Sequence, residues 1–196
     1  MIYNLKDKND TKYFWRQLSM EELEETILLC NECVGENLYS EKELRNAIED
    51  PNHFFYLLFT EEKKIAGYIY FFLTDLKTIA DYTKLKEELF YDLCQGKENR
   101  VGKIQSVAVR EGNRGSNLSV DMIRFGLERL KEAQVPIVFG VCWKMGEFVP
   151  MKKTLCECGF HFFSEAKKIW FDDMKLICPY CKGRCHCDAE VYYRYL

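Results

Sequence analysis

The sequence predicts an α/β fold, in which a mixed central sheet carries helices on both faces. Short runs of aromatic and β-branched residues alternate with segments in which apolar residues recur every three or four positions. Ser-x-x-Glu capping boxes mark two helix starts near the N-terminus. The 196 residues, 47% of them hydrophobic, suit one core, so we expect a single domain over residues 1–196.

The first segment is expected to form a strand and two helices. Residues 13–18 predict the strand, and the capping box of Ser19 and Glu22 begins the first helix. A second box, at residues 40–43, begins the next helix. The apolar stripe of the first helix is expected to consist of Met20, Leu23, Ile27, Cys30 and Val34.

A hairpin and an insertion are expected next. Residues 53–59 and 65–73 are rich in aromatic and β-branched residues and flank the turn EEKK, which predicts two antiparallel strands. Three leucines at four-residue spacing then predict a helix that ends near Gly96. We therefore expect residues 75–100 to form a helical insertion over one edge of the core.

The second half of the chain predicts strands and helices in alternation. Residues 101–109 predict a strand, which a polar turn connects to a helix. One face of that helix is expected to be apolar and to carry Met122, Ile123, Gly126, Leu130 and Ala133. The later elements are expected at residues 136–143 (strand), 148–158 (short helix), 160–169 (strand) and 189–196 (strand).

Composition and charge narrow the function classes. The formal net charge is −3, so no strong basic field favours nucleic acid. No apolar run approaches the roughly 18 residues of a membrane span, and the first ten residues lack the apolar segment of a secretory signal. We therefore expect a cytoplasmic protein with neither nucleic acid nor membrane as partner. Because the cytoplasm is reducing, we expect the ten cysteines to be core residues, metal ligands or reactive thiols.

The stretch SVAVREGNRGSNLSVDM, residues 106–122, runs from the end of a strand through a polar turn into a helix. Such a junction directs several free backbone N–H groups to one point, where the helix dipole adds partial positive charge. This arrangement suits a pyrophosphate. The glycine spacing matches neither a Walker turn nor a GxGxxG dinucleotide fingerprint. The alternative is a capped helix start without a ligand, because Ser and Asn are common N-cap residues.

Two motifs and the order of the elements resemble the GNAT family of acyl-CoA-dependent N-acetyltransferases. The family's Arg/Gln-x-x-Gly-x-Gly/Ala turn is similar to residues 114–119, Arg-Gly-Ser-Asn-Leu-Ser, and its Gly-Phe junction is similar to Gly159-Phe160. The resemblance extends from Tyr13 to about Trp170. It implies a mostly antiparallel sheet and transfer of an acetyl group from acetyl-CoA to a primary amine of a small molecule or peptide.

The resemblance also implies where acetyl-CoA binds. The backbone of Val107 and Val109 would pair with the pantetheine arm, and the N–H groups of the turn would hold the pyrophosphate. Asn117 stands where the family prefers glycine, but asparagine tolerates a left-handed backbone better than most non-glycine residues. Ser119 replaces a smaller residue and adds one hydroxyl group. The residues of the turn are Arg114, Gly115, Ser116, Asn117, Leu118 and Ser119.

The family's usual catalytic side chains are absent from the matching positions. Gln105 stands where many members carry a glutamate, and Leu155 where they carry a tyrosine, with Cys156 beside it. Glutamine cannot accept a proton, so the identity of the general base for the amine stays open. If the alignment holds, Gln105→Glu is expected to raise turnover at least about tenfold. The candidate catalytic residues are Gln105, Glu147 and Cys156, with Asp75 and Glu165 as further carboxylates.

Three kinds of function stay open from the sequence. The first is an N-acetyltransferase, either slow or with its base on an acceptor-binding loop. The second is a catalytically silent acyl-CoA sensor or scaffold, which the missing glutamate and tyrosine favour. The third is an interaction module whose cysteine-rich loop contacts a protein or a nucleic acid.

The stretch CPYCKGRCHC, residues 178–187, holds four of the ten cysteines. Cys-Pro-x-Cys-x-Gly resembles one knuckle of a zinc ribbon, and four thiolates suit a structural, tetrahedral zinc ion. The alternatives are ligands from His186 or from Cys156 and Cys158, an iron–sulfur cluster, or a loop of free thiols. The expected zinc ligands are Cys178, Cys181, Cys185 and Cys187.

Overall fold

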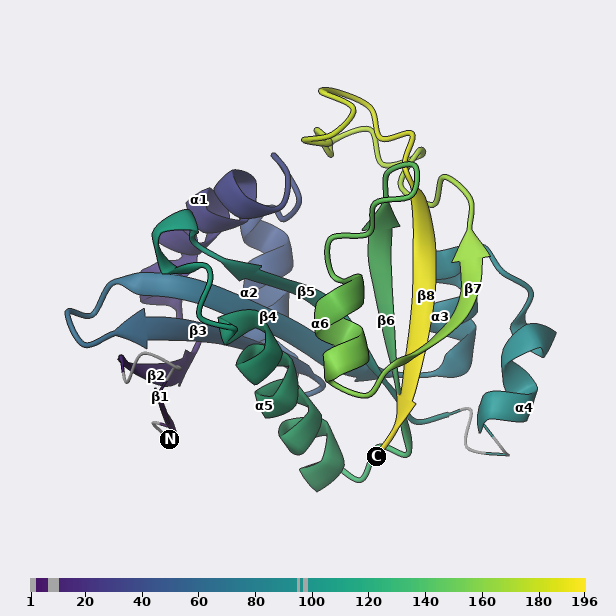
Figure 1. Cartoon of the computed structure of the whole chain (residues 1–196), viewed down its shortest axis with the longest axis horizontal. Helices are drawn as coiled ribbons and strands as arrows, with labels where there is room; N and C mark the ends of the chain where they lie inside the picture. Colours follow the sequence, from purple (N-terminus) through teal and green to yellow (C-terminus); the bar gives the residue numbers. More distant parts are fainter. Residues whose placement is uncertain (1–2, 7–10, 95, 97–98) are drawn as a thin grey trace.

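The strands form one sheet in the order β1-β2-β3-β4-β5-β6-β8-β7 (Figure 1). They are β1 (Tyr3–Lys6), β2 (Lys12–Gln17), β3 (His53–Thr60), β4 (Ile65–Thr74), β5 (Val101–Val109), β6 (Ile137–Lys144), β7 (His161–Ala166) and β8 (Asp188–Tyr195). The computed structural model describes residues 3–6, 11–94, 96 and 99–196. Residues 1–2 and 7–10, which belong to the segment tested for a secretory signal, lie outside the described residues. Residues 95, 97 and 98 of the expected insertion also lie outside them.

Within the described chain, neighbouring strands are antiparallel except for β5 and β6. Helices α5 and α6 lie on one face of the sheet, and α1, α2 and α3 lie on the other (Figure 1). The predicted fold class, a mixed and mostly antiparallel sheet with helices on both faces, is confirmed. The helices are α1 (Leu23–Cys33), α2 (Glu41–Glu49), α3 (Leu76–Thr83), α4 (Tyr91–Cys94), α5 (Leu118–Glu132) and α6 (Lys152–Glu157).

Helix α5 packs closely on the sheet through the apolar face that its spacing predicts. Met122, Ile123 and Leu130 are fully buried, and each such side chain stabilises the fold by about 1.5–3 kcal/mol. A Cβ atom at Gly126 would lie only 2.9 Å from Ile69 Cδ1, so this glycine allows the close approach of α5 to β4. None of the helices in the described ranges has both the length and the apolar composition needed to cross a membrane.

The sheet splits between its two central strands. The parallel pairing of β5 with β6 covers three residue pairs, ending at Ile104 and Gly140. At that point β5 contains a bulge, because Gln105 has no partner of its own between the Ile104–Phe71 and Ser106–Tyr70 pairs. A bulge bends its strand, and β5 and β6 run apart beyond it (Figure 1). The edge of β5 that faces β6 is therefore left without a strand partner.

Two expectations for the N-terminal segment are wrong. A further strand, β1, precedes β2, but four residues are too few to give an alternation signal. Met20 was expected on the buried stripe of the first helix and is 43% exposed. Residues 20–22 form a 3-10 turn before α1, so the spacing of an α-helix does not apply to them. The buried positions of α1 are Leu23, Thr26, Leu29 and Cys30.

The prediction of a helix that ends near Gly96 is also wrong. Helix α3 ends at Lys84, which has a left-handed φ of 56°, and a 3-10 turn and the four-residue α4 follow. The leucines therefore share no continuous helical face, and Leu89 is 53% exposed. Helix α6 begins at Lys152, later than expected, because residues 145–148 form a tight turn with mutual backbone hydrogen bonds.

Candidate functional site

A cavity of about 710 Å³ fills the split between β5 and β6. This size is typical of sites for small molecules and cofactors. One side of the cavity, which we call the cradle side, consists of residues 105–109 of β5, the turn that leads into α5, and the first residues of that helix. The other side, which we call the loop side, consists of Tyr82, Trp143, Trp170, Pro179 and Tyr180.

The turn before α5 contains two residues in the left-handed region. Gly115 has a φ of 89°, and Asn117, the N-cap residue, has a φ of 63°. The prediction that Asn117 tolerates this conformation is confirmed, although its side chain makes no capping hydrogen bond. No hydrogen bond within the described chain uses the N–H of Gly115, Ser116 or Asn117. Leu118 and Ser119 begin the helix, where N–H groups lack intrahelical partners.

The side chains of the turn anchor it to its surroundings. Arg114 Nε donates to the carbonyl oxygen of Val109 at 2.9 Å, which ties the turn to the end of β5. Ser119 Oγ lies 3.3 Å from Thr154 Oγ1 and so links α5 to α6. Ser116 is buried and, unlike the rest of the turn from Arg114 to Ser119, does not line the cavity. These contacts hold five donor groups close together beside the free edge of β5.

Gln105 lines the cavity at the bulge, beside a buried lysine. Lys103 Nζ donates to Gln105 Oε1 and lies 3.8 Å from the centre of the Tyr82 ring. Lys103 is 1% exposed, and this burial lowers its pKa to about 7, although the nearby Cys142 thiol opposes the shift. Because Lys103 donates to the amide oxygen of Gln105, the amide NH₂ is the donor end, and it bonds the hydroxyl oxygen of Tyr82. Gln105 therefore offers a donor and no base.

Tyr82 of α3 provides a second donor on the wall of the cavity. Its hydroxyl oxygen accepts a hydrogen bond from Trp170 Nε1 at 3.0 Å. Burial raises the pKa of Tyr82 to about 12. Hydrogen bonds from Trp170 and Gln105 lower this pKa, but the effect of burial is larger. The hydroxyl group is thus protonated at neutral pH. Its oxygen already accepts, so its proton can be donated to a ligand.

The other candidate catalytic residues lie away from the cavity. Asp75 is the N-cap of α3, where its carboxylate accepts a backbone N–H. Glu165 forms surface ion pairs with two lysines. Glu147 and Cys156 are exposed and do not line the cavity. Leu155 does line it and is buried. The structure therefore brings Gln105 to the site but neither Glu147 nor Cys156.

The four cysteines of the C-terminal loop come together. Their Sγ atoms all lie within 4.8 Å of one another. Cys187 Sγ lies 3.7 Å from Cys181 Sγ and 3.8 Å from Cys178 Sγ. Thiolates bound tetrahedrally at about 2.3 Å from zinc stand about 3.8 Å apart. The backbone N–H of His186 donates to Cys181 Sγ at 3.3 Å. The geometry of the cluster thus fits a zinc ion.

The alternative ligands are not part of this group. In the described structure the group that could hold a metal ion consists of the four cysteines, without His186, Cys156 or Cys158. The His186 ring packs edge-on against Phe171 at 5.1 Å instead. Within this loop Lys182 adopts a left-handed backbone, with a φ of 53°.

Comparison with known proteins gives matches at the level of structure. No family model and no curated protein sequence matches the chain. A mosquito arylalkylamine N-acetyltransferase-like protein aligns with a TM-score of 0.64 at 14% identity, over 94% of this chain and 100% of that one. The ribosomal-protein-S18-alanine N-acetyltransferase of Escherichia coli aligns with a TM-score of 0.62 at 11% identity, over 93% of each chain. This is the GNAT fold.

The spermidine/spermine N-acetyltransferase of Vibrio cholerae also has this fold, with a TM-score of 0.59 at 16% identity over 93% of this chain and 92% of that one. The acceptors in these three names are an arylalkylamine, a protein alanine and a polyamine. The shared fold does not fix an activity or an acceptor, which depend on the residues of the cavity.

Sequence reasoning missed most of the loop side. Lys103 gave a usable signal, because a lysine in the middle of an apolar strand pattern is rarely buried without a reason. Tyr82, Trp143, Trp170 and Tyr180 gave none. They come from α3, β6 and two distant points of the connection between β7 and β8, and no sequence spacing links them.

Proposed function

We propose that this chain is a GNAT-family N-acetyltransferase that moves an acetyl group from acetyl-CoA to a primary amine of a small molecule or peptide. The observation that carries the proposal is that the free edge of β5 and the N-terminus of α5 meet in one cavity. A free strand edge pairs with extended, amide-containing chains, and a helix N-terminus binds phosphate. Coenzyme A contains both a pantetheine arm and a pyrophosphate.

The binding roles follow from these two features. Val107 and Val109 would pair through their backbone with the pantetheine arm. The carbonyl oxygen of Val109 already accepts from Arg114 Nε at 2.9 Å and lies 3.9 Å from Cys33 Sγ, so the pantetheine arm would share this acceptor with a weak thiol contact. The N–H of Arg114 already donates to the carbonyl oxygen of Glu111 at 3.1 Å. The five N–H groups from Gly115 to Ser119 would therefore hold the pyrophosphate. Of these, the free N–H groups of Gly115, Ser116 and Asn117 are the ones that need an acceptor.

In the reaction, the neutral amine nitrogen attacks the thioester carbonyl carbon and the C–S bond breaks. The amine nitrogen loses one proton and the thiolate of coenzyme A gains one, so the reaction balances. Tyr82 would donate a hydrogen bond to the negative charge that develops on the thioester group. Its pKa of about 12 lies above the value of about 8.5 for a thiol, so it donates this bond without giving up the proton.

The contact with Lys103 changes the expectation for Gln105→Glu. The new carboxylate would lie against Lys103 Nζ, and the resulting ion pair would hold the pKa of the carboxyl group down. A paired carboxylate is a poorer base than a free one. We therefore expect a gain in turnover well below the roughly tenfold that the sequence alone suggests.

We further propose that the cysteine cluster binds one structural zinc ion. Four thiolates complete a tetrahedral site and leave no position for substrate. None of the ten cysteines forms a disulfide bond in the structure.

A second candidate function is a catalytically silent acyl-CoA sensor or scaffold. It is favoured by Gln105 and Leu155, which line the cavity where the family carries a glutamate and a tyrosine. Both functions share the binding site and differ only in turnover.

The test is a calorimetric titration with acetyl-CoA, followed by an amine screen. We expect micromolar binding by the wild type and its loss in the Arg114→Ala, Gly115→Pro double variant, since proline removes an N–H and cannot adopt a φ of 89°. Gly112→Ala is the matched control, because a Cβ there meets nothing within 4 Å. Absence of binding by the folded wild type contradicts both functions. Binding without turnover of any amine selects the silent binder.

A further inference from the structure

The loop side of the cavity is aromatic and carries little charge. Four rings line it, and Tyr39, which also lines the cavity, adds a fifth. Of the described residues that line the cavity, Glu32 supplies the one carboxylate, and its Oε2 lies 3.5 Å from Arg110 Nε. That ion pair balances the charge of Glu32. The four rings of the loop side are Tyr82, Trp143, Trp170 and Tyr180.

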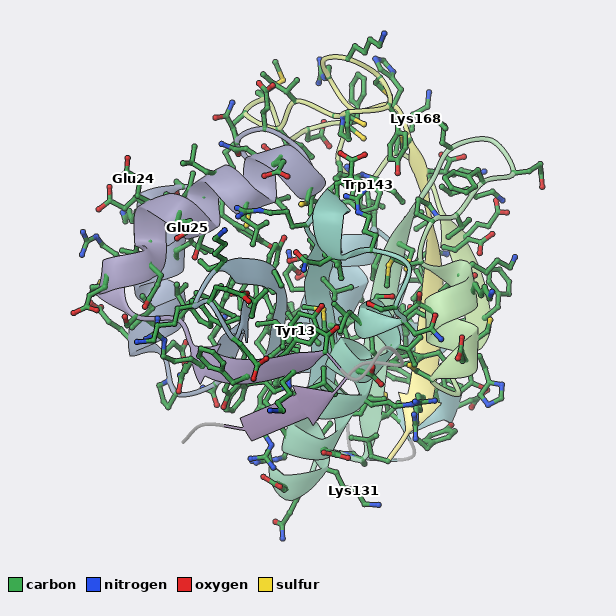
Figure 2. All side chains as sticks on the ribbon, turned by 60° about the vertical axis from the view of Figure 1, so that its left-hand side comes forward. Tyr13, Glu24, Glu25, Lys131, Trp143 and Lys168 are labelled. Atoms are coloured by element: carbon green, nitrogen blue, oxygen red, sulfur yellow. The ribbon has the colours of Figure 1, made fainter. Side chains whose placement is uncertain are left out.

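The cysteine cluster directly supports these rings. Tyr180 lies in the chain between Cys178 and Cys181, and its ring packs edge-on against Trp143 with the centroids 6.1 Å apart. Trp143 lies 5.3 Å from Trp170, and three of the cluster cysteines are buried against these same rings. Figure 2 shows Trp143 just below the cysteine-rich loop, close to its sulfur atoms. An ion in the cluster would fix the backbone on both sides of Tyr180.

The same loop reaches across the split in the sheet. Ile177 N donates to the carbonyl oxygen of Glu36 at 3.0 Å. A Cβ atom at Gly35 would lie 3.2 Å from Ile177 O and 3.4 Å from Pro179 Cδ, so the two segments are in close contact. In Figure 1 the loop extends from β8 towards α1, above the diverging ends of β5 and β6. The loop therefore joins the two halves of the sheet over the cavity.

We propose that the cysteine-rich loop, held by its zinc ion, is the acceptor-binding wall of the cavity, and that it selects a primary amine with a flat, apolar body. This inference rests on the proposed function, because it assigns the acceptor of that reaction. Aromatic rings bury flat apolar groups and orient them. A polyamine needs several carboxylates and an acidic acceptor needs cations, and the described loop side offers neither.

The experiment measures amine binding by the full-length, zinc-loaded protein in complex with coenzyme A. The probes are 2-phenylethylamine and spermidine, titrated by calorimetry. The titrations are repeated after zinc removal and with Tyr180→Ala, which leaves all four cysteines in place. Met174→Ala is the matched control, because Met174 belongs to the same long loop, is 74% exposed and does not line the cavity. Tryptophan emission reports loop order, since Trp143 and Trp170 contact the cluster.

We expect 2-phenylethylamine to bind at least about tenfold more tightly than spermidine. Zinc removal and Tyr180→Ala should each weaken 2-phenylethylamine binding at least about tenfold, with acetyl-CoA affinity changed by less than about threefold. Met174→Ala should change neither. Zinc removal should also shift the tryptophan emission.

Two results overturn the inference while the proposed function stands: equal or tighter binding of spermidine, or amine binding that neither zinc removal nor Tyr180→Ala changes, both with acetyl-CoA still bound. Failure of the wild type to bind acetyl-CoA is a different result, because it removes the proposed function and this inference with it.

Discussion

The cradle side of the cavity comes from one stretch of chain, whereas the loop side is assembled from three. Residues 105–119 pass along the free edge of β5 and through the turn into α5, so local backbone geometry forms the cradle. The loop side depends on contacts between side chains from α3, β6 and the segment after β7, and on a cluster of four sulfur atoms. Changes to one side should therefore leave the other intact.

Loss of the metal is expected to have the largest effect, and only on the loop side. A ligand at about 1,000 times its Kd stabilises a protein by about 4 kcal/mol, which corresponds to a shift in Tm of roughly 10 °C for a chain of this size. We expect Cys181→Ser to lower Tm by about this amount and to lose zinc, as measured by calorimetry and metal analysis. Cys156→Ser is the matched control, because Cys156 is also exposed but lies outside the cluster. Equal Tm values for the two variants would contradict a structural zinc site.

The stability of the protein should depend on pH through Lys103, which lies where the two sides of the cavity meet. Burial lowers the pKa of Lys103 to about 7 in the folded protein, whereas an unfolded lysine titrates near 10.5. Between these values the unfolded state binds more protons, so the contribution of Lys103 to stability rises with pH from about 7 to 10.5 and is least favourable below pH 7.

Lys103→Met removes this dependence. We expect the gain in the free energy of unfolding on this substitution to be larger at pH 6 than at pH 9, by roughly 2 kcal/mol. Urea unfolding at the two pH values measures the difference. A gain independent of pH would mean that Lys103 is not buried as a depressed-pKa group.

Tyr82→Phe tests the donor at the centre of the cavity. We expect kcat to fall about tenfold, or about 1.4 kcal/mol in activation free energy, with the Kd for acetyl-CoA unchanged. Tyr39→Phe is the matched control, because the Tyr39 hydroxyl lies 2.7 Å from Ser106 Oγ and is already engaged. If both variants lose the same activity, the role of Tyr82 is packing rather than hydrogen bonding.

Substitution of Asn117 is expected to have the smallest effect, and it tests whether the cradle needs a left-handed residue at this position. Its φ of 63° should make Asn117→Ala destabilising by about 1 kcal/mol, whereas Asn117→Gly should be nearly neutral. Acetyl-CoA affinity should follow the same order, because the turn presents its N–H groups only in this conformation. Zinc content should be the same in both variants. A neutral Asn117→Ala would show that the turn does not need the left-handed residue.

Much of the fold was predictable because its signals are local. The hairpin of β3 and β4, the apolar face of α5 and the two capping boxes depend on neighbouring residues, and all are present. The errors fall where local signals compete. Lys84 ends α3 in a left-handed turn, and the evenly spaced leucines that follow it lie across a 3-10 turn and α4 instead of on one helix.

By itself the sequence determined the fold class, the polar turn before α5 that we propose holds phosphate, and the grouping of the four cysteines, because each depends on local patterns along the chain. The tertiary structure decided which side chains share the cavity. It excluded Glu147 and Cys156, placed Lys103 against Gln105, and brought Tyr180 of the cysteine-rich loop beside Trp143. The physical reason is that β5 and β6 part after three residue pairs, and long-range packing around that split sets the contacts of every residue within it.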